Sequence, residues 1–420
     1  MPRSLYTLLT WLVLPLVFLR LLWRARKAPV YRQRWSERIA RYRAPLAPGE
    51  KLVLFHAVSV GEVHAARPLI ERLQRERPAL RILVTSTTPT GSARVREIFG
   101  AKVMHVYLPY DLPRFVDRFL DHFRPAVLVV LETELWPNLL HACGERGLPV
   151  ILANARLSAR SAGRYGHAPG MARELLGHLS LVAAQAEADG ARFVALGLPE
   201  ERLIVNGSLK FDVAIDEGKL AAARALKADW QRPVWIAAST REGEDAKVLR
   251  AFREVLAAAP QVLLVLVPRH PERFDEAAEL AESLGLRVQR RSTEVDLAAG
   301  MQVLIGDTMG DMPFYYGLAD VAFVGGSLVD TGCQNLIEPA ALGLPVLSGP
   351  SLYNFQAVSD LLITAGGQQV VANETALAQA VLRLVGDPAT ARAMGSKARA
   401  VVGNNQGATE RLCRMILERL

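Results

Sequence analysis

The sequence predicts an α/β protein with two doubly wound parallel-sheet domains and an apolar helix at its N-terminus. Apolar runs with strand character alternate with amphipathic stretches along most of the chain. These runs are too many for one compact sheet, and a separate long apolar run lies close to residue 1. A chain of 420 residues suits two to three domains of about 150 residues each.

The first element is the apolar run from Leu5 to Trp23, and Leu5–Leu19 contains no charged residue. Nineteen helical residues extend roughly 28 Å, close to the ~30 Å hydrocarbon core of a bilayer. Arg20 can extend to the interface, and the two tryptophans of the run suit interfacial anchoring. We expect a membrane anchor that spans the bilayer once. The alternative is a helix that lies in the interface.

Basic residues gather directly behind this run. Residues 1–43 contain ten Lys and Arg and one acidic residue, Glu37, whereas the rest of the chain contains 40 basic and 41 acidic residues. The positive-inside rule places the following domains in the cytoplasm. The Arg24–Lys27 segment contains no typical small-residue cleavage site, which argues against a cleaved signal peptide. The chain after residue 43, called the body here, is therefore almost neutral, which argues against a nucleic-acid partner.

The body follows as strand-like runs at 52–58, 81–87, 126–132, 149–155, 179–185, 233–239, 261–268, 321–327 and 345–349. Amphipathic stretches such as 62–77, 242–259 and 271–284 separate them. The polar stretch 211–232 lacks a strand pattern. We therefore expect an anchor with a basic juxtamembrane segment (1–43), a first domain (44–215), a linker (216–232) and a second domain with C-terminal helices (233–420). Because open α/β sheets bind ligands at the carboxyl ends of their strands, a cleft between the two domains is the expected site.

Several classes of protein lack their signatures here. Cys143, Cys333 and Cys413 form no CxxC pair, which excludes a disulfide scaffold and a zinc ribbon. No P-loop (GxxxxGKS/T), no GxGxxG after the first strand and no HExxH is present. The sequence therefore predicts no metal and no cofactor.

Candidate catalytic residues follow strands of the first domain. Glu62 ends the segment HAVSVGE, at the start of a helix, where the helix dipole favours its ionised form and lowers its basicity. It is a candidate base, or a plain helix-start glutamate. Glu132 and Glu134 follow the 126–132 run, where two carboxylates are costly unless they are paired or used. Lys210 precedes the linker and offers a cation.

The second domain contains candidates for nucleotide binding. Arg269 and His270 follow an apolar strand, and the turn Gly306–Asp311 offers backbone amides to a phosphate. Asn335 and Glu338 stand three residues apart at a helix start. There the glutamate can accept both hydrogens of a ribose diol, or the two residues can form a capping box.

The segment from Glu338 to Val346, EPAALGLPV, resembles the donor-binding helix of GT-B glycosyltransferases, which consist of two Rossmann-like domains around a cleft. The other motifs resemble one family of them, the 3-deoxy-D-manno-octulosonic acid (Kdo) transferases of lipopolysaccharide and lipid A biosynthesis. The matching segments are HAVSVGE, TSTTPTG, ETELWPN, ANARLS, NGSLKFD, STREGE, PRHPER, GDTMGDM and FVGGSLV, followed by the EPAALG segment.

The resemblance implies an inverting transfer of Kdo from CMP-Kdo to the phosphorylated disaccharide precursor of lipid A, on the cytoplasmic face of a bacterial inner membrane. It implies that Glu62 is the general base and that Glu132 and Lys210 support the transition state. The residues that it implies for the CMP part of the donor are Arg269, His270, Met309, Gly310, Asp311, Asn335, Leu336, Ile337 and Glu338. Two departures stand out, because Asp311 replaces a common glutamate and Gln334 replaces a histidine.

Two alternatives remain open at this point. One is another membrane-associated GT-B enzyme that uses a UDP-sugar, which nucleotide protection by CMP or UDP would distinguish. The other is a non-catalytic membrane protein that binds a sugar nucleotide, which any turnover would exclude.

Overall fold

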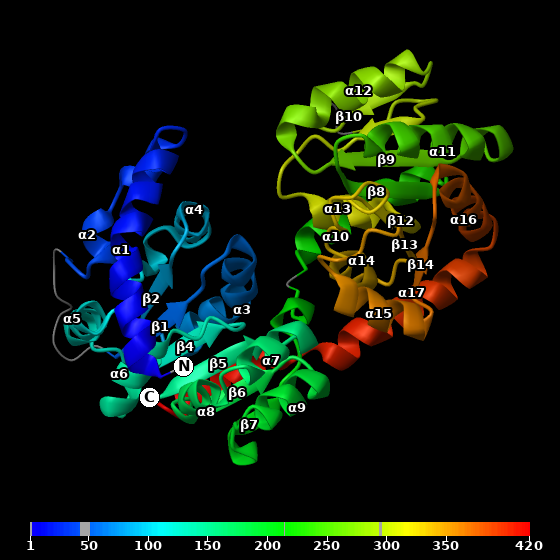
Figure 1. The fold of residues 1–420 in the computed structure, drawn as a ribbon. Coiled ribbons are helices and arrows are strands. Elements are labelled where there is room, and N and C mark those ends of the chain that lie inside the picture. The colour runs from blue at the N-terminus through cyan, green and yellow to red at the C-terminus, as the bar shows by residue number, and fades with distance from the viewer. Residues whose placement is uncertain (1, 43–50, 214, 294–295) are drawn as a thin grey trace. The chain divides into compact units, whose positions relative to one another are not determined.

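The computed structural model describes residues 2–42, 51–213, 215–293 and 296–420. The chain divides into two compact units, Met1–Asp212 with Gln406–Leu420 (unit 1) and Val213–Asn405 (unit 2). Each unit contains a seven-stranded parallel sheet with helices on its faces (Figure 1). The α/β class with two doubly wound sheets is thus confirmed.

The sheet of unit 1 has the strand order β3-β2-β1-β4-β5-β6-β7. Its strands are β1 (Leu52–His56), β2 (Arg81–Ser86), β3 (Met104–Tyr107), β4 (Val127–Leu131), β5 (Val150–Ala155), β6 (Leu181–Ala184) and β7 (Leu203–Val205). Its helices are α1 (Arg3–Ala25), α2 (Trp35–Arg38), α3 (Val60–Glu76), α4 (Pro89–Phe99), α5 (Pro113–Phe123), α6 (Pro137–Glu145), α7 (Ala159–Gly166), α8 (Pro169–Gly177), α9 (Glu187–Ala195) and α18 (Ala408–Leu417).

Successive side chains of the central strand β1 belong alternately to the two hydrophobic cores of unit 1. Val53 and Phe55 contribute to a core shared with α3, α4 and α18, whereas Leu52 and Leu54 contribute to a core shared with α5, α6 and α8. Strand β1 pairs with β2 and β4, and its last residue, His56, lies opposite Thr85 of β2. The carboxyl ends of these three strands therefore meet at one edge of the sheet.

The sheet of unit 2 has the order β10-β11-β9-β8-β12-β13-β14. Its strands are β8 (Val234–Thr240), β9 (Leu263–Pro268), β10 (Val288–Arg290), β11 (Val303–Ile305), β12 (Val321–Val324), β13 (Val346–Ser348) and β14 (Gln368–Val370). Its helices are α10 (Glu217–Trp230), α11 (Glu244–Ala258), α12 (Phe274–Ser283), α13 (Met312–Leu318), α14 (Ile337–Ala341), α15 (Gln356–Ala365), α16 (Glu374–Gly386) and α17 (Pro388–Asn405). Short 3-10 turns include η4 (Leu209–Phe211).

The unit boundaries differ from the predicted domains in two places. The predicted linker 216–232 contains α10, which packs against α13 inside unit 2. Helix α18, predicted to belong to the second domain, buries Leu412 and Ile416 in a core of unit 1. Apolar spacing along a helix shows which face is buried but does not show which sheet covers it. The predicted boundary between residues 43 and 44 lies outside the described residues.

Helix α1 packs along unit 1. Near its beginning the Thr7 hydroxyl donates to Oδ1 of Asn138 over 3.0 Å, and near its end the ring of Phe18 meets Tyr110 edge-on at 5.6 Å. The opposite face exposes the apolar residues Leu5, Leu8, Leu9, Leu12, Val13, Leu16, Leu19 and Leu22. Within the described part of the chain, α1 alone is long and apolar enough to cross a membrane, with a mean hydropathy of 2.0.

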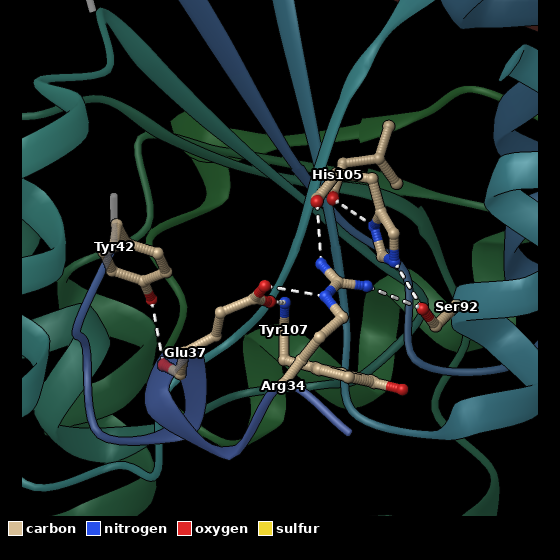
Figure 2. Close-up of polar contacts among 7 residues, drawn as sticks. Arg34, Glu37, Tyr42, Ser92, His105 and Tyr107 are labelled. Carbon is tan, nitrogen blue, oxygen red and sulfur yellow. Dashed lines mark hydrogen bonds and ion pairs between the residues drawn. The ribbon is translucent and has the colours of Figure 1, made fainter. Parts of the chain in front are cut away.

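Figure 2 shows how the basic segment behind α1 is fixed to the edge of the sheet. The Arg34 guanidinium pairs with Oε1 of Glu37 at 2.6 Å and donates to the carbonyl of His105 at 2.8 Å (Figure 2). The other carboxylate oxygen of Glu37 accepts the backbone N–H of Tyr107 at 2.8 Å. Strand β3 is thereby held to the segment that follows α1.

Candidate active site

Glu62 lies in the first turn of α3, directly after the carboxyl end of β1. It forms a capping box with Ser59, in which the Ser59 hydroxyl accepts the Glu62 N–H at 3.2 Å. The Glu62 carboxylate accepts the N–H groups of Ser59 at 3.2 Å and of Val58 at 2.8 Å. The predicted helix-start position is confirmed. Glu62 is 5% exposed, and the two N–H groups orient its carboxylate.

The electrostatics around Glu62 differ from the expectation for a helix start. Burial raises the pKa of Glu62, hydrogen bonds from Ser59 and Val58 lower it, and the carboxylates of Glu132 and Glu134 raise it. Desolvation dominates over the helix terminus because the side chain is buried. The expected loss of basicity is therefore not found. The structure instead places the three predicted carboxylates close enough to interact, and the result is a stronger base.

Glu132 occupies a strained position at the end of β4. Its φ is 58°, in the left-handed region that non-glycine residues rarely adopt. Its N–H remains bonded to the carbonyl of Ala153 on β5 at 3.0 Å. Asn154, beside it on β5, has a φ of 53°. Strained backbone at the carboxyl ends of two neighbouring strands is typical of functional sites.

His56 joins β1 to two other segments of the site. Its Nδ1 lies 3.0 Å from the Thr85 hydroxyl, which itself donates to the carbonyl of Phe55. Its Nε2 accepts the indole N–H of Trp136 at 3.2 Å. The proton of the neutral ring therefore resides on Nδ1, because Nε2 is the acceptor. This network links the HAVSVGE and ETELWPN segments. The sequence did not identify His56 as a site residue.

The burial of His56 predicts a pH dependence of stability. Desolvation lowers the pKa of His56 from 6.5 to about 4, so the folded chain keeps it neutral while the unfolded chain protonates it near pH 6.5. The contribution of this pKa difference to the unfolding free energy is fully present above pH 6.5, and it is lost as the pH falls toward 4. Between pH 7.5 and pH 5.0 we expect the wild type to lose about 1–2 kcal/mol more unfolding free energy than His56→Gln.

Urea denaturation at both pH values, followed by tryptophan fluorescence, measures this difference. The comparison with His56→Gln is needed because burial raises the pKa of Asp111 to about 6, which favours folding as the pH falls. Equal pH dependence of the two proteins would contradict a buried neutral His56.

Lys210 lies in the η4 turn, which packs against α3. The turn is fixed by the backbone N–H of Leu209, which donates to Oδ1 of Asn154 at 3.1 Å. Lys210 is partly exposed. The helix that carries Glu62 and the turn that carries Lys210 are therefore neighbours, which keeps the predicted role of Lys210 open.

In unit 2, Asn335 and Glu338 lie at the start of α14. The Asn335 amide donates to Oε1 of Glu338 at 2.9 Å, and its Oδ1 accepts the N–H of Ile337 at 2.9 Å. The alternative of a capping box is not formed, because Leu336 occupies the N-cap position and makes no side-chain cap. Burial raises the pKa of Glu338, and the charge of Arg269 opposes that shift. Two of the predicted donor residues, Arg269 and Glu338, are thus close enough in space to interact.

Three more predicted donor residues lie at the start of α13. Asp311 pairs with Lys219 of α10 at 2.7 Å, and this lysine also donates to the carbonyl of Gly310 at 2.9 Å. Lys219 holds the pKa of Asp311 below its usual value. Met309 is 60% exposed. The sequence did not predict Lys219, because α10 was assigned to the linker. The remaining predicted donor residue, His270, contacts the Arg241 guanidinium through Nε2.

Glu244 organises the glycine-rich loop after β12 and was also missed. Its side chain is fully buried, and its carboxylate accepts the N–H groups of Gly326 at 2.5 Å, Ser327 at 3.1 Å, Leu328 at 2.9 Å and Arg241 at 3.1 Å. The STREGE and FVGGSLV segments each stood out in the sequence, but nothing there indicated that one side chain joins them.

Comparison with known proteins identifies the class and then the family. The model of the family described as 3-deoxy-D-manno-octulosonic-acid transferase (kdotransferase) matches residues 33–213. A 3-deoxy-D-manno-octulosonic acid transferase of Haemophilus influenzae is 42% identical over 98% of this chain and 97% of its own. One of Bordetella pertussis is 41% identical over 98% of each chain. The crystal structure of UDP-GlcNAc 2-epimerase from Neisseria meningitidis superposes with a TM-score of 0.56 at 15% identity, over 88% of this chain and all of that one.

The two seven-stranded parallel sheets and this structural likeness define a GT-B α/β protein. Within that class, sequence similarity along almost the whole length of the chain distinguishes one family from the others. The chain belongs to the 3-deoxy-D-manno-octulosonic acid transferase family, and its reaction is the transfer of Kdo. The resemblance found in the motifs is confirmed. The roles of individual residues remain predictions.

Proposed function

We propose that this chain transfers Kdo from CMP-Kdo to the phosphorylated disaccharide precursor of lipid A, with inversion and without a metal at the reacting atoms. The observation that carries the proposal is the full-length similarity to Kdo transferases. The arrangement of Glu62, Glu132 and Glu134 supports the chemistry, because it supplies a buried base with a raised pKa.

The reaction is a single displacement. The carboxylate of Glu62 takes the proton of an acceptor hydroxyl as its oxygen bonds to the anomeric carbon of Kdo. The bond from that carbon to the CMP phosphate breaks, and CMP leaves with the electron pair. The sugar develops oxocarbenium character between the two events. Glu132 and Lys210 are proposed to stabilise this charge distribution.

Unit 2 is proposed to bind the CMP part of the donor. Glu338, oriented by Asn335, accepts from the ribose hydroxyls, and Arg269 pairs with the phosphate. The exposed backbone around Met309 and Gly310 offers N–H groups to the same phosphate. Fixed donors of this kind stabilise the leaving CMP without a metal.

Two cavities of unit 1 support an amphiphilic, phosphorylated acceptor. One, of about 540 Å³, is lined by Tyr6, Glu134, Trp136, Arg164, Tyr165 and Met171 among others. The other, of about 240 Å³, lies between α1 and the sheet and is lined by Arg20, Arg24 and Arg38. Apolar and aromatic walls suit the lipid part, and guanidinium groups suit its phosphates.

Helix α1 is proposed to bind the inner membrane from the cytoplasmic side. Its contacts with Asn138 and Tyr110 hold it along unit 1, and this arrangement favours an interfacial helix over a spanning one. The basic residues that follow α1 favour anionic lipid.

The exposed face of α1 provides a test of membrane binding. Leu12 and Leu16 are 65% and 62% exposed. We expect the double substitution Leu12→Asp and Leu16→Asp to lower the vesicle-bound fraction at least tenfold, because each leucine contributes on the order of 1–2 kcal/mol of apolar transfer. Flotation with anionic vesicles measures it. The control changes Val205 and Val370, exposed valines of β7 and β14, to aspartate. Equal loss in both variants would contradict the proposal.

The transfer itself is tested with purified full-length protein. CMP-Kdo generated in situ is mixed with tetra-acylated lipid A precursor in the presence of EDTA, and products are read by mass spectrometry. We expect a mass gain of one or more Kdo units. No gain, with thermal protection by CMP intact, would overturn the acceptor or the catalytic assignment. Protection by UDP instead of CMP would overturn the donor.

A further inference from the structure

Three potential metal ligands converge in unit 1 at residues to which neither the motifs nor the proposed reaction assigns a role. His141 lies on α6, while Glu174 and His178 lie on and just after α8, one helical turn apart. Their ligand atoms all lie within 4.8 Å of one another. The two histidines are partly buried, and Glu174 is exposed. Helices α6 and α8 pack against each other and hold the three side chains together.

The imidazole of His178 has an unsatisfied nitrogen. Its Nε2 is buried and has no hydrogen-bond partner. A buried polar atom without a partner is rare in folded proteins, and a bound ion is one of its explanations. The ring also lies edge-on to His141, with centroids 5.5 Å apart.

Gly144 of α6 makes room for this ring. A Cβ atom at Gly144 would lie 2.4 Å from Nδ1 of His178, closer than any real contact. The glycine is helical, so it is not needed for a special backbone conformation. Its lack of a side chain lets the His178 ring approach α6, where His141 lies one turn earlier.

We propose that His141, Glu174 and His178 bind a zinc ion that ties α6 to α8. Two imidazoles and one carboxylate are a common zinc ligand set, and water completes the tetrahedron. Nitrogen ligands argue against magnesium and calcium, which prefer oxygen.

Glu174 already has one charged neighbour, but this ion pair is weak. Arg3, at the beginning of α1, lies 3.7 Å from Oε1 of Glu174, and both side chains are more than 30% exposed. Such a pair contributes little, so a divalent ion displaces it readily. Arg3 retains its bond to Asn138 at 3.2 Å, on the same helix as His141. The ion therefore stiffens the part of unit 1 on which α1 begins, and it takes no part in the transfer step.

Metal titration of the full chain in detergent tests the site. The protein is first treated with a chelator and dialysed. Co²⁺ is then added, its visible absorption is followed, and Zn²⁺ is used to displace it. We expect one equivalent per chain with the strong absorption of a four-coordinate site, bleached by one equivalent of Zn²⁺. Zinc should also raise the melting temperature of the stripped protein.

Three variants and one control decide the assignment. Glu174→Gln changes an exposed side chain, so the fold remains, and we expect at least tenfold weaker Co²⁺ binding because the anionic ligand is lost. His141→Ala should bind weaker still. Gly144→Ala should weaken binding by displacing His178, although it removes no ligand. His167→Ala removes an exposed histidine at the end of α7 and should bind as the wild type does.

Unchanged binding in Glu174→Gln and His141→Ala, or equal loss in His167→Ala, would overturn the site. Absence of saturable binding to the wild type would overturn it as well. These results are independent of Kdo transfer. A functioning transferase that binds no zinc leaves the proposed function intact, and zinc binding without turnover leaves the site intact.

Discussion

Replacement of Glu62 by glutamine is expected to lower Kdo transfer at least 100-fold while leaving CMP binding unchanged. A positioned general base contributes typically 10²–10⁴-fold, and the amide of glutamine cannot accept the acceptor's proton. CMP binding is expected to persist because the proposed CMP ligands all lie in unit 2. Single-turnover transfer and thermal protection by CMP give the two readouts. Near-normal turnover would remove Glu62 from the mechanism.

Ser59→Ala is the matched control for this experiment. Glu62 both caps α3 and is proposed to act as base, so loss of activity has two possible origins. Ser59→Ala removes one half of the capping box but keeps the carboxylate. It should cost about 0.5–2 kcal/mol of stability and retain most of the turnover. If it abolished transfer as Glu62→Gln does, the effect would be attributed to the start of α3.

The pH dependence of turnover further distinguishes loss of the general base from loss of the helix cap. Because burial and the neighbouring carboxylates raise the pKa of Glu62, turnover should fall with decreasing pH as this carboxylate takes up a proton. The residual activity of Glu62→Gln should lack this acidic limb. A helix that has merely frayed would keep it.

The second large effect is expected at Glu244. Substitution by alanine leaves four N–H groups without their buried acceptor, those of Arg241, Gly326, Ser327 and Leu328. Each unsatisfied buried group costs on the order of 1–3 kcal/mol, and part is recovered where water enters, so we expect a loss of about 3 kcal/mol or more. Urea denaturation measures it, and loss of CMP protection should accompany it.

Two further variants test whether the loss of stability depends on the Glu244 carboxylate itself. Glu242→Ala removes an exposed carboxylate two residues earlier and should change stability by less than about 0.5 kcal/mol. Glu244→Gln keeps the shape but turns an NH₂ group toward N–H donors, so it should recover little. A loss below about 1 kcal/mol in Glu244→Ala would mean that the loop does not depend on this carboxylate.

Most of the fold could be predicted from hydrophobic patterning. All nine strand-like runs are strands, because buried parallel strands produce continuous apolar segments. The five strands that were not predicted, β3, β7, β10, β11 and β14, contain only three or four residues. Four of them are partly exposed and lie at sheet edges, where an apolar run is not required.

The site could be predicted only where the interacting residues lie close together in the sequence. The Ser59–Glu62 spacing marks a helix start in the sequence itself, and the structure has it there. The pair of Lys219 and Asp311 spans 92 residues, and the bond from Gly326 to Glu244 spans 82. No pattern in a single sequence connects residues so far apart. The raised pKa of Glu62 likewise depends on burial, which helix-start chemistry alone does not reveal.

The attachment of α1 along unit 1 has a consequence for how the proposed reaction would be measured. With α1 fixed to the domain at Thr7 and at Phe18, the unit would stand at a constant height over the leaflet that receives the exposed leucines. An acceptor in the same leaflet then reaches the enzyme by lateral diffusion. Turnover should depend on the mole fraction of acceptor in the surface, and dilution with inert lipid should slow transfer even when the total amount of acceptor is unchanged.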